Sequence, residues 1–319
     1  MKRNLACIAL ALVAAGCATR IDVQGHRGAR GLAPENTLPA FEKALSLGVT
    51  TLELDTAVTK DGVVVIGHDP SPNPDIARLD GKWIEKASTR PIHEMTFAEL
   101  QRYDIGRLKP ETAYAKRYPE QVAVDGTRYS RLADLFALVR RSGDRQVRFN
   151  IETKVSPLAP YETLPPEAFA RALVAEIRAN RMTDRATIQS FDWRTLQLVQ
   201  KREPTIPTVY LTVQTPNNDN VKDERWTAGF KLADHGGSVP RMIKAAGGAV
   251  WSRNQGAVTE ALVKEAQGLG LKVIPWTVNE PAAMERLIDW GVDGIITDYP
   301  NRLREVMQRK RMPLPRPIQ

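Results

Sequence analysis

Three acidic residues stand in two segments of the chain that have the pattern of buried strands. Glu53 and Asp55 are two residues apart in "LELD", so their side chains should lie on the same side of a strand. Glu152 stands in a second such segment, "NIETK". Carboxylates gathered in one place cannot all stay charged without a compensating cation. A hard divalent ion, Mg²⁺ or Ca²⁺, fits this set, and zinc is disfavoured because no cysteine and no close histidine pair accompanies it.

Basic residues and histidines accompany these acids. Arg27 follows His26 in "GHRGARGLAPENT", and Lys154 is the last residue of "NIETK". Cations beside a metal indicate an anionic substrate, and phosphate fits because arginine binds its oxygens in a fork. His26 and His68 have the chemistry to act as base and acid in a displacement at phosphorus. The residue types therefore predict hydrolysis of a phosphate ester.

Eight short β-rich runs alternate with amphipathic helical stretches along the chain. This order requires a parallel sheet with right-handed crossovers, and eight such units close into a TIM (β/α)8 barrel. Barrel enzymes carry their active sites at the carboxyl ends of the strands, where His26, Lys154 and Trp276 stand. Trp276 fits either a platform for a ligand or a core position. The expected strands are residues 21–26, 50–58, 146–154, 186–191, 208–213, 249–253, 272–278 and 293–298.

The segment "TKDG" after the second expected strand is too short for a crossover, so it predicts a β-hairpin. A register that pairs Val58 with Val63 would bring His68 close to Glu53.

Three further segments depart from the alternation. Residues 70–125 are polar, contain prolines and lack periodicity, which predicts an insertion over one face of the barrel and not a second domain. A smaller loop is expected at residues 214–238. The tail "MPLPRPIQ" is expected to be disordered or extended.

Five segments occur in an order that is highly specific in combination: "HRGARGLAPENT", "LELDTAVTKDGVVVIGHD", "NIETK", "VIPWTVN" and "DGIITDYP". Together they resemble the glycerophosphodiester phosphodiesterase family, and they cover nearly the whole chain after its first segment. The resemblance implies a barrel with a divalent metal that releases glycerol 3-phosphate from glycerophosphodiesters. One departure is Gly67, where the family usually has a larger residue, and this change could loosen His68.

The resemblance also implies a role for each matching residue. His26 and His68 would be the acid–base pair. As a separate hypothesis, we assign the base role to His26 and the donor role to His68. The implied metal ligands are Glu53, Asp55 and Glu152, and the implied phosphate contacts are Arg27 and Lys154.

Other polar residues are expected to have structural roles. Glu35 should bond the turn or the start of the following helix, and Asp298 should cap the last helix. His93 and His235 lie in irregular segments, so we expect them on the surface.

The first segment, "MKRNLACIALALVAAGC", has two basic residues before an apolar run that is too short to span a bilayer. Small residues ending in Gly16 directly before Cys17 resemble a bacterial lipoprotein processing site, and ordinary signal cleavage nearby is the alternative. We expect residues 1–16 to be a removed signal peptide. Residues 17–319 would form a single domain in the periplasm, held at a membrane by a lipid on Cys17.

Cysteine content and net charge limit the remaining possibilities. The sequence has two cysteines, of which Cys7 leaves with the signal, so the mature chain can form no internal disulfide. The net charge of +8 suits anionic substrates or lipid headgroups. No block of lysines and arginines indicates nucleic acid, and nothing in the pattern specifies an oligomeric state.

Three other functions fit parts of this pattern. A lysophospholipase D acting on long-chain substrates would need an apolar groove in the insertion, which has Trp83 and Ile84 but few other bulky apolar residues in a row. A phosphoinositide-type phospholipase C uses paired histidines in a barrel but predicts no three-carboxylate cluster. A non-catalytic surface protein should have lost a histidine or a metal ligand, and none is missing. Small, deacylated substrates are therefore favoured.

Overall fold

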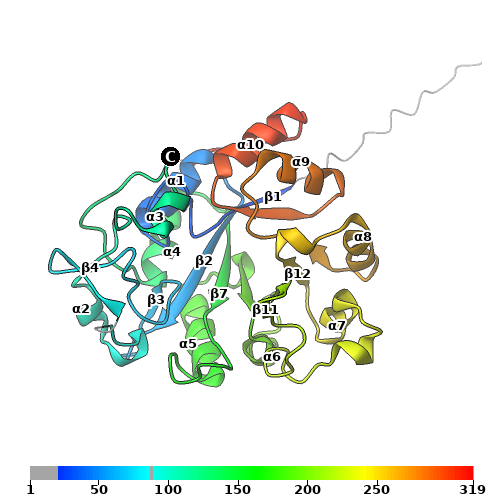
Figure 1. Ribbon diagram of the computed structural model, residues 1–319, viewed down its shortest axis with the longest axis horizontal. Helices are drawn as coiled ribbons and strands as arrows, with labels where there is room; N and C mark the ends of the chain where they lie inside the picture. The colour runs from blue at the N-terminus through cyan, green and yellow to red at the C-terminus, as the bar shows by residue number, and fades with distance from the viewer. Residues whose placement is uncertain (1–20, 87–88, 319) are drawn as a thin grey trace, which may run out of the picture.

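The computed structural model describes residues 21–86 and 89–318, so the predicted signal peptide and Cys17 lie outside the described residues. Eight parallel strands form a barrel with helices around it (Figure 1), as predicted. Each expected strand is present, and the order around the barrel is β13-β12-β9-β8-β7-β2-β1-β14. The strands are β1 (Asp22–Gly25), β2 (Thr51–Val58), β7 (Arg148–Thr153), β8 (Ala186–Ser190), β9 (Thr208–Thr212), β12 (Val250–Arg253), β13 (Lys272–Val273) and β14 (Gly294–Thr297).

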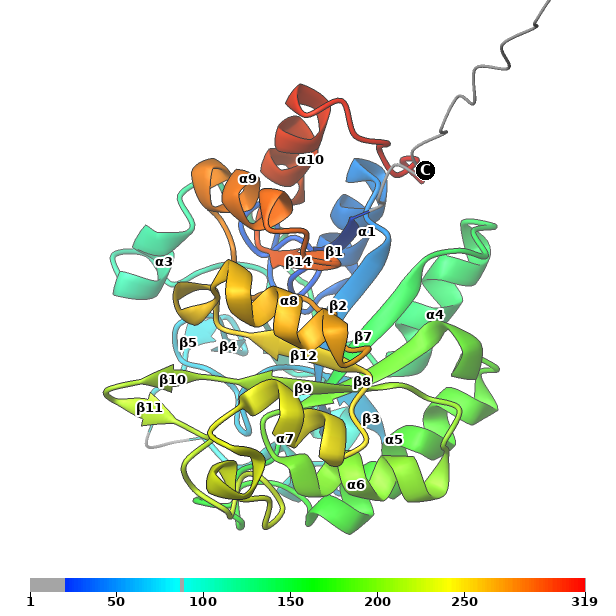
Figure 2. The same ribbon diagram turned by 90° about the vertical axis from the view of Figure 1, so that its right-hand side faces the viewer.

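The outer helices follow the strands in chain order and lie around the sheet in both views (Figures 1 and 2). None of the described helices has the length and apolar character needed to cross a bilayer. The helices are α1 (Leu38–Leu47), α4 (Leu132–Arg141), α5 (Pro166–Ala179), α6 (Trp193–Arg202), α7 (Val239–Ala245), α8 (Glu260–Gly268), α9 (Pro281–Asp289) and α10 (Pro300–Arg309), with 3-10 turns η3 (Thr183–Arg185) and η5 (Gln255–Ala257).

Backbone hydrogen bonds close the barrel between its two end strands. Asp293 N donates to Val273 O (2.9 Å), and Ile296 N donates to Pro275 O (3.0 Å). On its other side β14 pairs in parallel with β1, so that Gly25 lies opposite Thr297. The first and last strands are therefore neighbours. Their carboxyl ends lie at the same end of the barrel, which we call the mouth.

Apolar side chains pack between the outside of the sheet and the helices, whereas the inside of the barrel also contains buried polar side chains such as Glu53, Asn150 and Gln189. All eight residues of β2 are buried, because a barrel strand has one face inside and the other under helices. Outside the sheet, Phe136 of α4 packs edge-to-face on Phe149 of β7, with ring centroids 4.9 Å apart. A separate small cluster consists of Val209, Val250, Ile274 and Ile296.

The predicted hairpin is present, but its predicted register is wrong by one residue. Strand β3 (Val64–Ile66) runs antiparallel to β2, with Val58 opposite Val64 instead of Val63. The turn is one residue longer than expected, because Thr59 N bonds Val63 O (3.0 Å) and Gly62 takes a left-handed position with φ of 80°. The shift sets Gly67 N on Asp55 O (3.0 Å). His68 follows this contact just beyond β3, and its charge acts on the carboxyl of Asp55.

The segment between β3 and α4 has regular elements too short for periodicity to reveal. Its strands form a three-stranded antiparallel sheet in the order β5-β4-β6. A buried cluster that includes Ile92, Met95 and Leu100 packs it against the hairpin residues Ala57 and Val65. The elements are β4 (Arg78–Leu79), β5 (Lys82–Trp83), η2 (Ile92–Glu94), α2 (Phe97–Leu100), β6 (Tyr103–Asp104) and α3 (Ala113–Arg117).

The smaller loop and the tail are also ordered. The loop after β9 contains β10 (Gln214–Thr215), β11 (Asn218–Asp219) and the 3-10 turn η4 (Leu232–His235). The described tail is extended and bound to the barrel, since Arg304 Nη1 donates to Pro315 O (2.6 Å) and Ile318 N donates to Leu45 O (2.9 Å).

Candidate active site

The three acidic residues predicted as metal ligands come together in the barrel. Glu53 and Asp55 lie on β2, Glu152 lies on β7, and the ladder pairs Asp55 with Glu152. All three side chains are buried, and each offers an oxygen within 4.8 Å of those of the other two. A buried set of carboxylate oxygens is the donor set that a hard divalent cation prefers.

Glu53 is held by two donors that fix its carboxylate. Arg27 N donates to Oε2 (2.8 Å), and Gln189 Nε2 donates to Oε1 (2.6 Å). Gln189 in turn accepts from Asn150 Nδ2 (2.9 Å), which also reaches Gln24 Oε1 (3.0 Å). Sequence analysis missed this buried amide chain. The signal was present, because an amide at the end of β8 within an apolar run requires a buried polar partner.

The acids do not ionise together in the protein alone. Burial raises the pKa of Glu152 to about 7, although Lys154 opposes the shift. Burial also raises the pKa of Glu53 well above its ordinary value, and the neighbouring charge of Asp55 adds to this. Burial acts in the same direction on Asp55, but Arg27, His68 and Lys154 outweigh it and hold that pKa well below the ordinary value. The cluster therefore lacks positive charge, and a divalent cation would supply it.

The loop after β1 brings a guanidinium to the acids. Arg27 lies with Nη1 2.6 Å from Glu35 Oε1 and Nε 3.1 Å from Asp55 Oδ2, and its φ of 50° is rare for a residue with a side chain. Nε is not aimed at Asp55 and makes no hydrogen bond within the described residues. Gly28 lets the loop approach α1, because a Cβ there would lie 2.6 Å from the Ala40 carbonyl carbon.

The "PENT" segment begins α1 and also contacts the residues of the candidate site. Thr37 caps α1 by accepting from Ala40 N, as its place in the sequence indicates. Asn36 Nδ2 donates to Asp55 Oδ2 (2.9 Å), a contact that sequence analysis missed. Glu35 has the structural role that was predicted, but its partners are the Arg27 guanidinium and the Tyr114 hydroxyl of α3.

Lys154 lies beside the acids and close to a pair of aromatic side chains, Phe191 and Trp276. Its Nζ is 2.8 Å from Glu152 Oε1 and 3.7 Å from Asp55 Oδ1. The same Nζ lies 5.8 Å from the centroid of Phe191, which packs edge-to-face with Trp276. Trp276 is half-buried, so it has both a core contact and an open face. Phe191, which directly follows β8, is an aromatic residue of this site that sequence analysis missed.

His26 is oriented by an aspartate from the last strand. Its Nδ1 lies 2.6 Å from Asp298 Oδ1, and its Nε2 lies 3.9 Å from Glu53 Oε2. Arg30 Nε (2.8 Å) and Asn279 Nδ2 (2.7 Å) hold the same carboxylate. The expectation that Asp298 caps the last helix is wrong: the residue at the N-terminus of α10 is Tyr299, and no side chain caps it. The signal that was missed is barrel closure, which places β14 beside β1.

The charged groups around His26 determine which of its ring nitrogens carries the proton. Burial, followed by the Arg30 charge, lowers the pKa of His26 to about 4. His26 and Arg30 hold the pKa of Asp298 far below its ordinary value despite burial. A neutral imidazole beside a carboxylate donates from Nδ1, so the lone pair of Nε2 faces the acidic cluster.

His68 lies on the hairpin side of the same mouth and is held in the same way. Its Nδ1 is 2.9 Å from Asp69 Oδ1, and Asn73 Nδ2 donates to the other oxygen of Asp69 (2.7 Å). Burial and the Arg27 charge lower its pKa, but its side chain is 31% exposed against 12% for His26. A Cβ on Gly67 would lie 3.1 Å from Tyr129, so Tyr129 fills the space that a larger residue would take.

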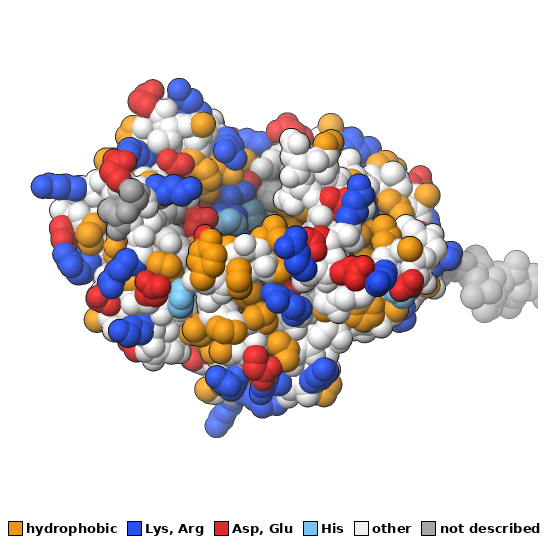
Figure 3. Space-filling view, turned by 60° about the horizontal axis from the view of Figure 1, so that its bottom comes forward, with side chains coloured by type: hydrophobic (Ala, Val, Ile, Leu, Met, Phe, Trp, Pro, Cys, Tyr) orange, Lys and Arg blue, Asp and Glu red, His pale blue; other side chains and the backbone are white. Residues whose placement is uncertain are grey.

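The space-filling view looks into the hollow that these residues form (Figure 3). Histidine, acidic and basic side chains gather at its floor, with apolar side chains along one edge. The two other histidines in the described residues are half-buried away from the cluster. His93 contacts Glu162 O (3.1 Å), and His235 lies beside Phe230 with ring centroids 6.4 Å apart.

Comparison with known proteins agrees with this geometry. The sequence profile of the glycerophosphoryl diester phosphodiesterase family matches residues 26–302. The chain belongs to this family. A glycerophosphodiester phosphodiesterase of Bacillus subtilis is 27% identical over 90% of this chain and 86% of its own length. A human lysophospholipase D is 26% identical, with 90% of this chain and 85% of its own length covered.

Solved structures share the barrel. A crystal structure from Silicibacter pomeroyi, which bears a glycerophosphoryl diester phosphodiesterase name, has a TM-score of 0.82 at 35% identity and covers 93% of this chain and 96% of its own. A phosphodiesterase of Oleispira antarctica in complex with the product sn-glycerol-3-phosphate has a TM-score of 0.66 at 20% identity, with 90% and 96% covered. The chain is accordingly a phosphodiesterase that hydrolyses glycerophosphodiesters, and the family depends on a metal.

The raised pKa of Glu152 predicts how pH acts on the chelated protein. Its pKa of about 7 exceeds the ordinary 4.5, so the folded state binds a proton that the unfolded state releases earlier. The contribution of Glu152 to stability should therefore fall as pH rises from about 5 to about 8. Glu152→Gln cannot titrate, so its Tm relative to that of the parent should rise over this range. Mg²⁺ or Ca²⁺ should raise the parent Tm more at the higher pH, because bound cations favour ionised ligands.

The exposed Glu42→Gln variant is the control and should keep the parent slope, which differential scanning calorimetry would measure. Equal slopes for the parent and Glu152→Gln would contradict the raised pKa.

Proposed function

We propose that the enzyme releases glycerol 3-phosphate and an alcohol, with His26 and His68 as the acid–base pair and a divalent cation on Glu53, Asp55 and Glu152. One observation carries this proposal: two histidines, each oriented by its own aspartate, flank one buried carboxylate cluster. The product complex of the Oleispira phosphodiesterase supports the assignment of glycerol 3-phosphate.

Arg27 and Lys154 are proposed to bind the phosphoryl oxygens. Arg27 leaves Nε without a hydrogen bond in the described residues, and Lys154 has donors beyond the one on Glu152. Both cations lie beside the acids, so a phosphodiester bound by them would sit against the cluster. The cation held there would neutralise charge on the phosphoryl oxygens and lower the pKa of a hydroxyl bound to it.

The proposed chemistry has two steps. His26 Nε2 takes the proton from the glycerol hydroxyl next to the ester, and the hydroxyl oxygen forms a bond to phosphorus. The bond from phosphorus to the alcohol oxygen breaks, and His68 donates the proton that this oxygen takes up. In the second step His68 takes a proton from water, the water oxygen attacks the cyclic phosphate, and His26 returns its proton to the glycerol oxygen.

A long-chain lysophospholipid is the second candidate substrate, because exposed apolar residues follow β7 near the mouth. Leu158 is 55% exposed and Tyr161 is 73% exposed. The insertion does not add an apolar groove to them, since Ile84 is buried in its own cluster and Trp83 is covered by Arg78, 5.6 Å away. Small deacylated substrates therefore remain the preferred class, and comparison of glycerophosphocholine with lysophosphatidylcholine separates the two.

The enzyme is also proposed to be a periplasmic lipoprotein with its anchor on Cys17. The sequence before Ile21 supports this: a basic start, a short apolar run and small residues before the cysteine.

Histidine variants test the proposed chemistry through the leaving group. His26→Ala and His68→Ala should each lower kcat on glycerophosphocholine by roughly 10²–10⁴-fold. On a p-nitrophenyl glycerophosphodiester His68→Ala should lose much less, because p-nitrophenolate departs without a proton. His26→Ala should lose as much on both substrates. Glycerol 3-phosphate release would be measured with chelation and metal add-back as the control.

Equal losses on both substrates for both variants would contradict the assignment of His26 as the base and His68 as the proton donor. Full activity after exhaustive chelation would exclude the metal assignment.

Asp298→Asn tests the positioning of His26. The amide cannot accept the Nδ1 proton as the carboxylate does, so kcat should fall by roughly 10²-fold, within the range that a general base contributes. Because Asp298 raises the pKa of His26, the acid limb of the pH profile should move to lower pH. The matched control is Asp293→Asn, at the other end of β14, which should change neither quantity. An unchanged acid limb would show that Asp298 has only a structural role.

The anchor is tested by Cys17→Ser and by a chain that starts at Ala18 behind a cleavable signal. Both should hydrolyse glycerophosphocholine as the parent does, and after a salt wash of the membranes the second should be in the soluble periplasmic fraction, because lipid chains supply the attachment. If the chain from Ala18 still sediments with membranes after a salt wash, Cys17 is not what holds the enzyme there.

A further inference from the structure

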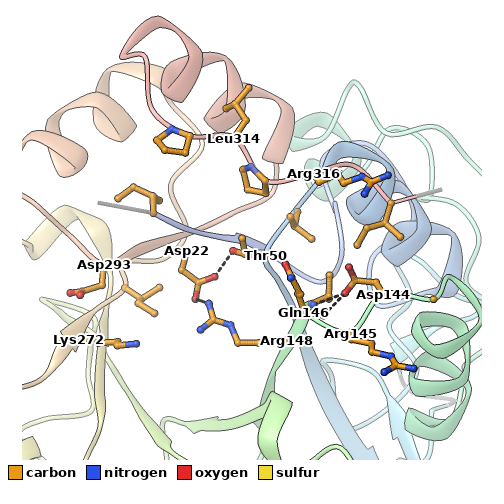
Figure 4. A pocket seen from close by; sticks show the side chains of 18 residues that line it. Asp22, Thr50, Asp144, Arg145, Gln146, Arg148, Lys272, Asp293, Leu314 and Arg316 are labelled. Carbon is orange, nitrogen blue, oxygen red and sulfur yellow. Dashed lines mark hydrogen bonds and ion pairs between the residues drawn. The ribbon is translucent and has the colours of Figure 1, made fainter. Parts of the chain in front are cut away.

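A cavity of about 940 Å³ opens at the end of the barrel opposite the catalytic mouth (Figure 4). Residues that begin barrel strands line it, among them Asp22 of β1, Arg148 of β7 and Lys272 of β13. The catalytic side chains His26 and Asp298 follow the carboxyl ends of β1 and β14. Because all eight strands are parallel, the cavity and the mouth face opposite ways along the barrel.

Three cations around this cavity have no ion-pair or hydrogen-bond partner within the described residues. Arg145, Lys272 and Arg316 are exposed, and they come from the segment before β7, from β13 and from the tail. Figure 4 shows them on the rim with their charged ends apart from one another. Arg148 is also exposed but pairs with Asp22 (2.9 Å).

The carboxylates of this end are engaged by the fold. Asp22 accepts from Thr50 Oγ1 (2.6 Å) in addition to its pair with Arg148. Asp144 accepts from the backbone N of Gln146 (2.7 Å), and Asp293 accepts from the backbone N of Val273 (2.9 Å). The acids are thus bound to strand beginnings while the cations extend outward. The cavity is lined by four basic and three acidic side chains, so its net charge is +1, and the free basic groups are the outermost of these charges.

An exposed apolar residue lines the same cavity as these cations. Leu314 is 41% exposed in the extended tail, where the bond from Arg304 to Pro315 O (2.6 Å) holds the chain against the barrel. An exposed leucine on the same cavity as three free basic side chains suits the headgroup region of a bilayer, where the apolar side chain can be buried while the charged groups stay at the surface.

We propose that this end, the N-terminal face (Arg145, Arg148, Lys272, Leu314 and Arg316), lies against a membrane surface that carries anionic lipid headgroups. Ile21 lines the same cavity, and Cys17 is four residues earlier. Four residues span at most about 14 Å. A lipid on Cys17 therefore holds the N-terminal face at the membrane, and the basic residues add the second contact that stable attachment of lipidated proteins commonly requires.

This orientation deepens the proposed function, on which it rests for its anchor and its substrate class. With the N-terminal face on the bilayer, the mouth with His26 and His68 points away from it. The anchored enzyme then takes water-soluble, deacylated glycerophosphodiesters and does not reach lysolipids in the bilayer that carries it.

The test uses the chain from Ala18 to Gln319, which contains every described residue but no anchor cysteine. It should bind phosphatidylglycerol vesicles at low salt and not phosphatidylcholine vesicles. Neutralising Arg145, Lys272 and Arg316 together to glutamine should weaken binding at least tenfold, since each basic residue near such a surface contributes about fivefold. The matched control, Lys60→Gln with Arg171→Gln and Lys264→Gln, removes the same charge from exposed positions elsewhere and should bind as the parent does.

Four outcomes would overturn the proposal. The first is no binding to phosphatidylglycerol, and the second is equal weakening by both triple variants. In the third, Leu158→Ser with Tyr161→Ser abolishes binding while the N-terminal-face variant keeps it, which would place the mouth on the membrane. In the fourth, inorganic phosphate stabilises the parent, but not the N-terminal-face variant, at concentrations that prevent vesicle binding, which would indicate a site for free anions.

Hydrolysis assays of the same proteins distinguish failure of this proposal from failure of the proposed function. Both triple variants should hydrolyse glycerophosphocholine at the parent rate, so loss of that activity in the parent itself would contradict the function and not the surface. The lipidated enzyme on vesicles should hydrolyse soluble glycerophosphocholine as fast as the chain from Ala18. Anchoring should not accelerate hydrolysis of lysophosphatidylcholine in the same vesicles, and acceleration would refute the orientation.

Discussion

Burial of three carboxylates within 4.8 Å of one another is the constraint on which the rest of the site depends. Such a group is stable only if each member has donors or positive charge beside it. The donors come from Arg27 N for Glu53, from Asn36 for Asp55 and from Lys154 for Glu152. The loop after β1 therefore takes its shape from the acids of the next strand, and the left-handed backbone at Arg27 is held by the contacts it makes there.

The same constraint explains why the sequence predicts the cluster so well. Residues two apart on one strand must share a side, and parallel neighbours in a barrel put their carboxyl ends together. For Glu53, Asp55 and Glu152, those two rules are enough to place the acids side by side. The eight strands were predictable for a related reason, because apolar runs alternating with amphipathic helices allow few other folds.

What the sequence left open depends on contacts that no local pattern carries. The turn of the hairpin contains one left-handed glycine, Gly62, and the register differs by one residue from the one that the sequence predicts. Gln189 and Asn36 are ordinary polar residues until the fold brings them to an acid. Asp298 has the appearance of a helix cap, and only closure of the barrel shows that it faces His26.

The pairing of His26 with Asp298 joins residues 272 positions apart, on the first and last strands of the barrel. During synthesis the histidine emerges early, whereas its aspartate is among the last residues of the domain to arrive. A chain whose final strand has not docked has an unoriented imidazole and an open seam between β1 and β13. With His26 in its proposed role, catalytic competence would coincide with completion of the barrel, because the carboxylate that orients the imidazole follows the final strand.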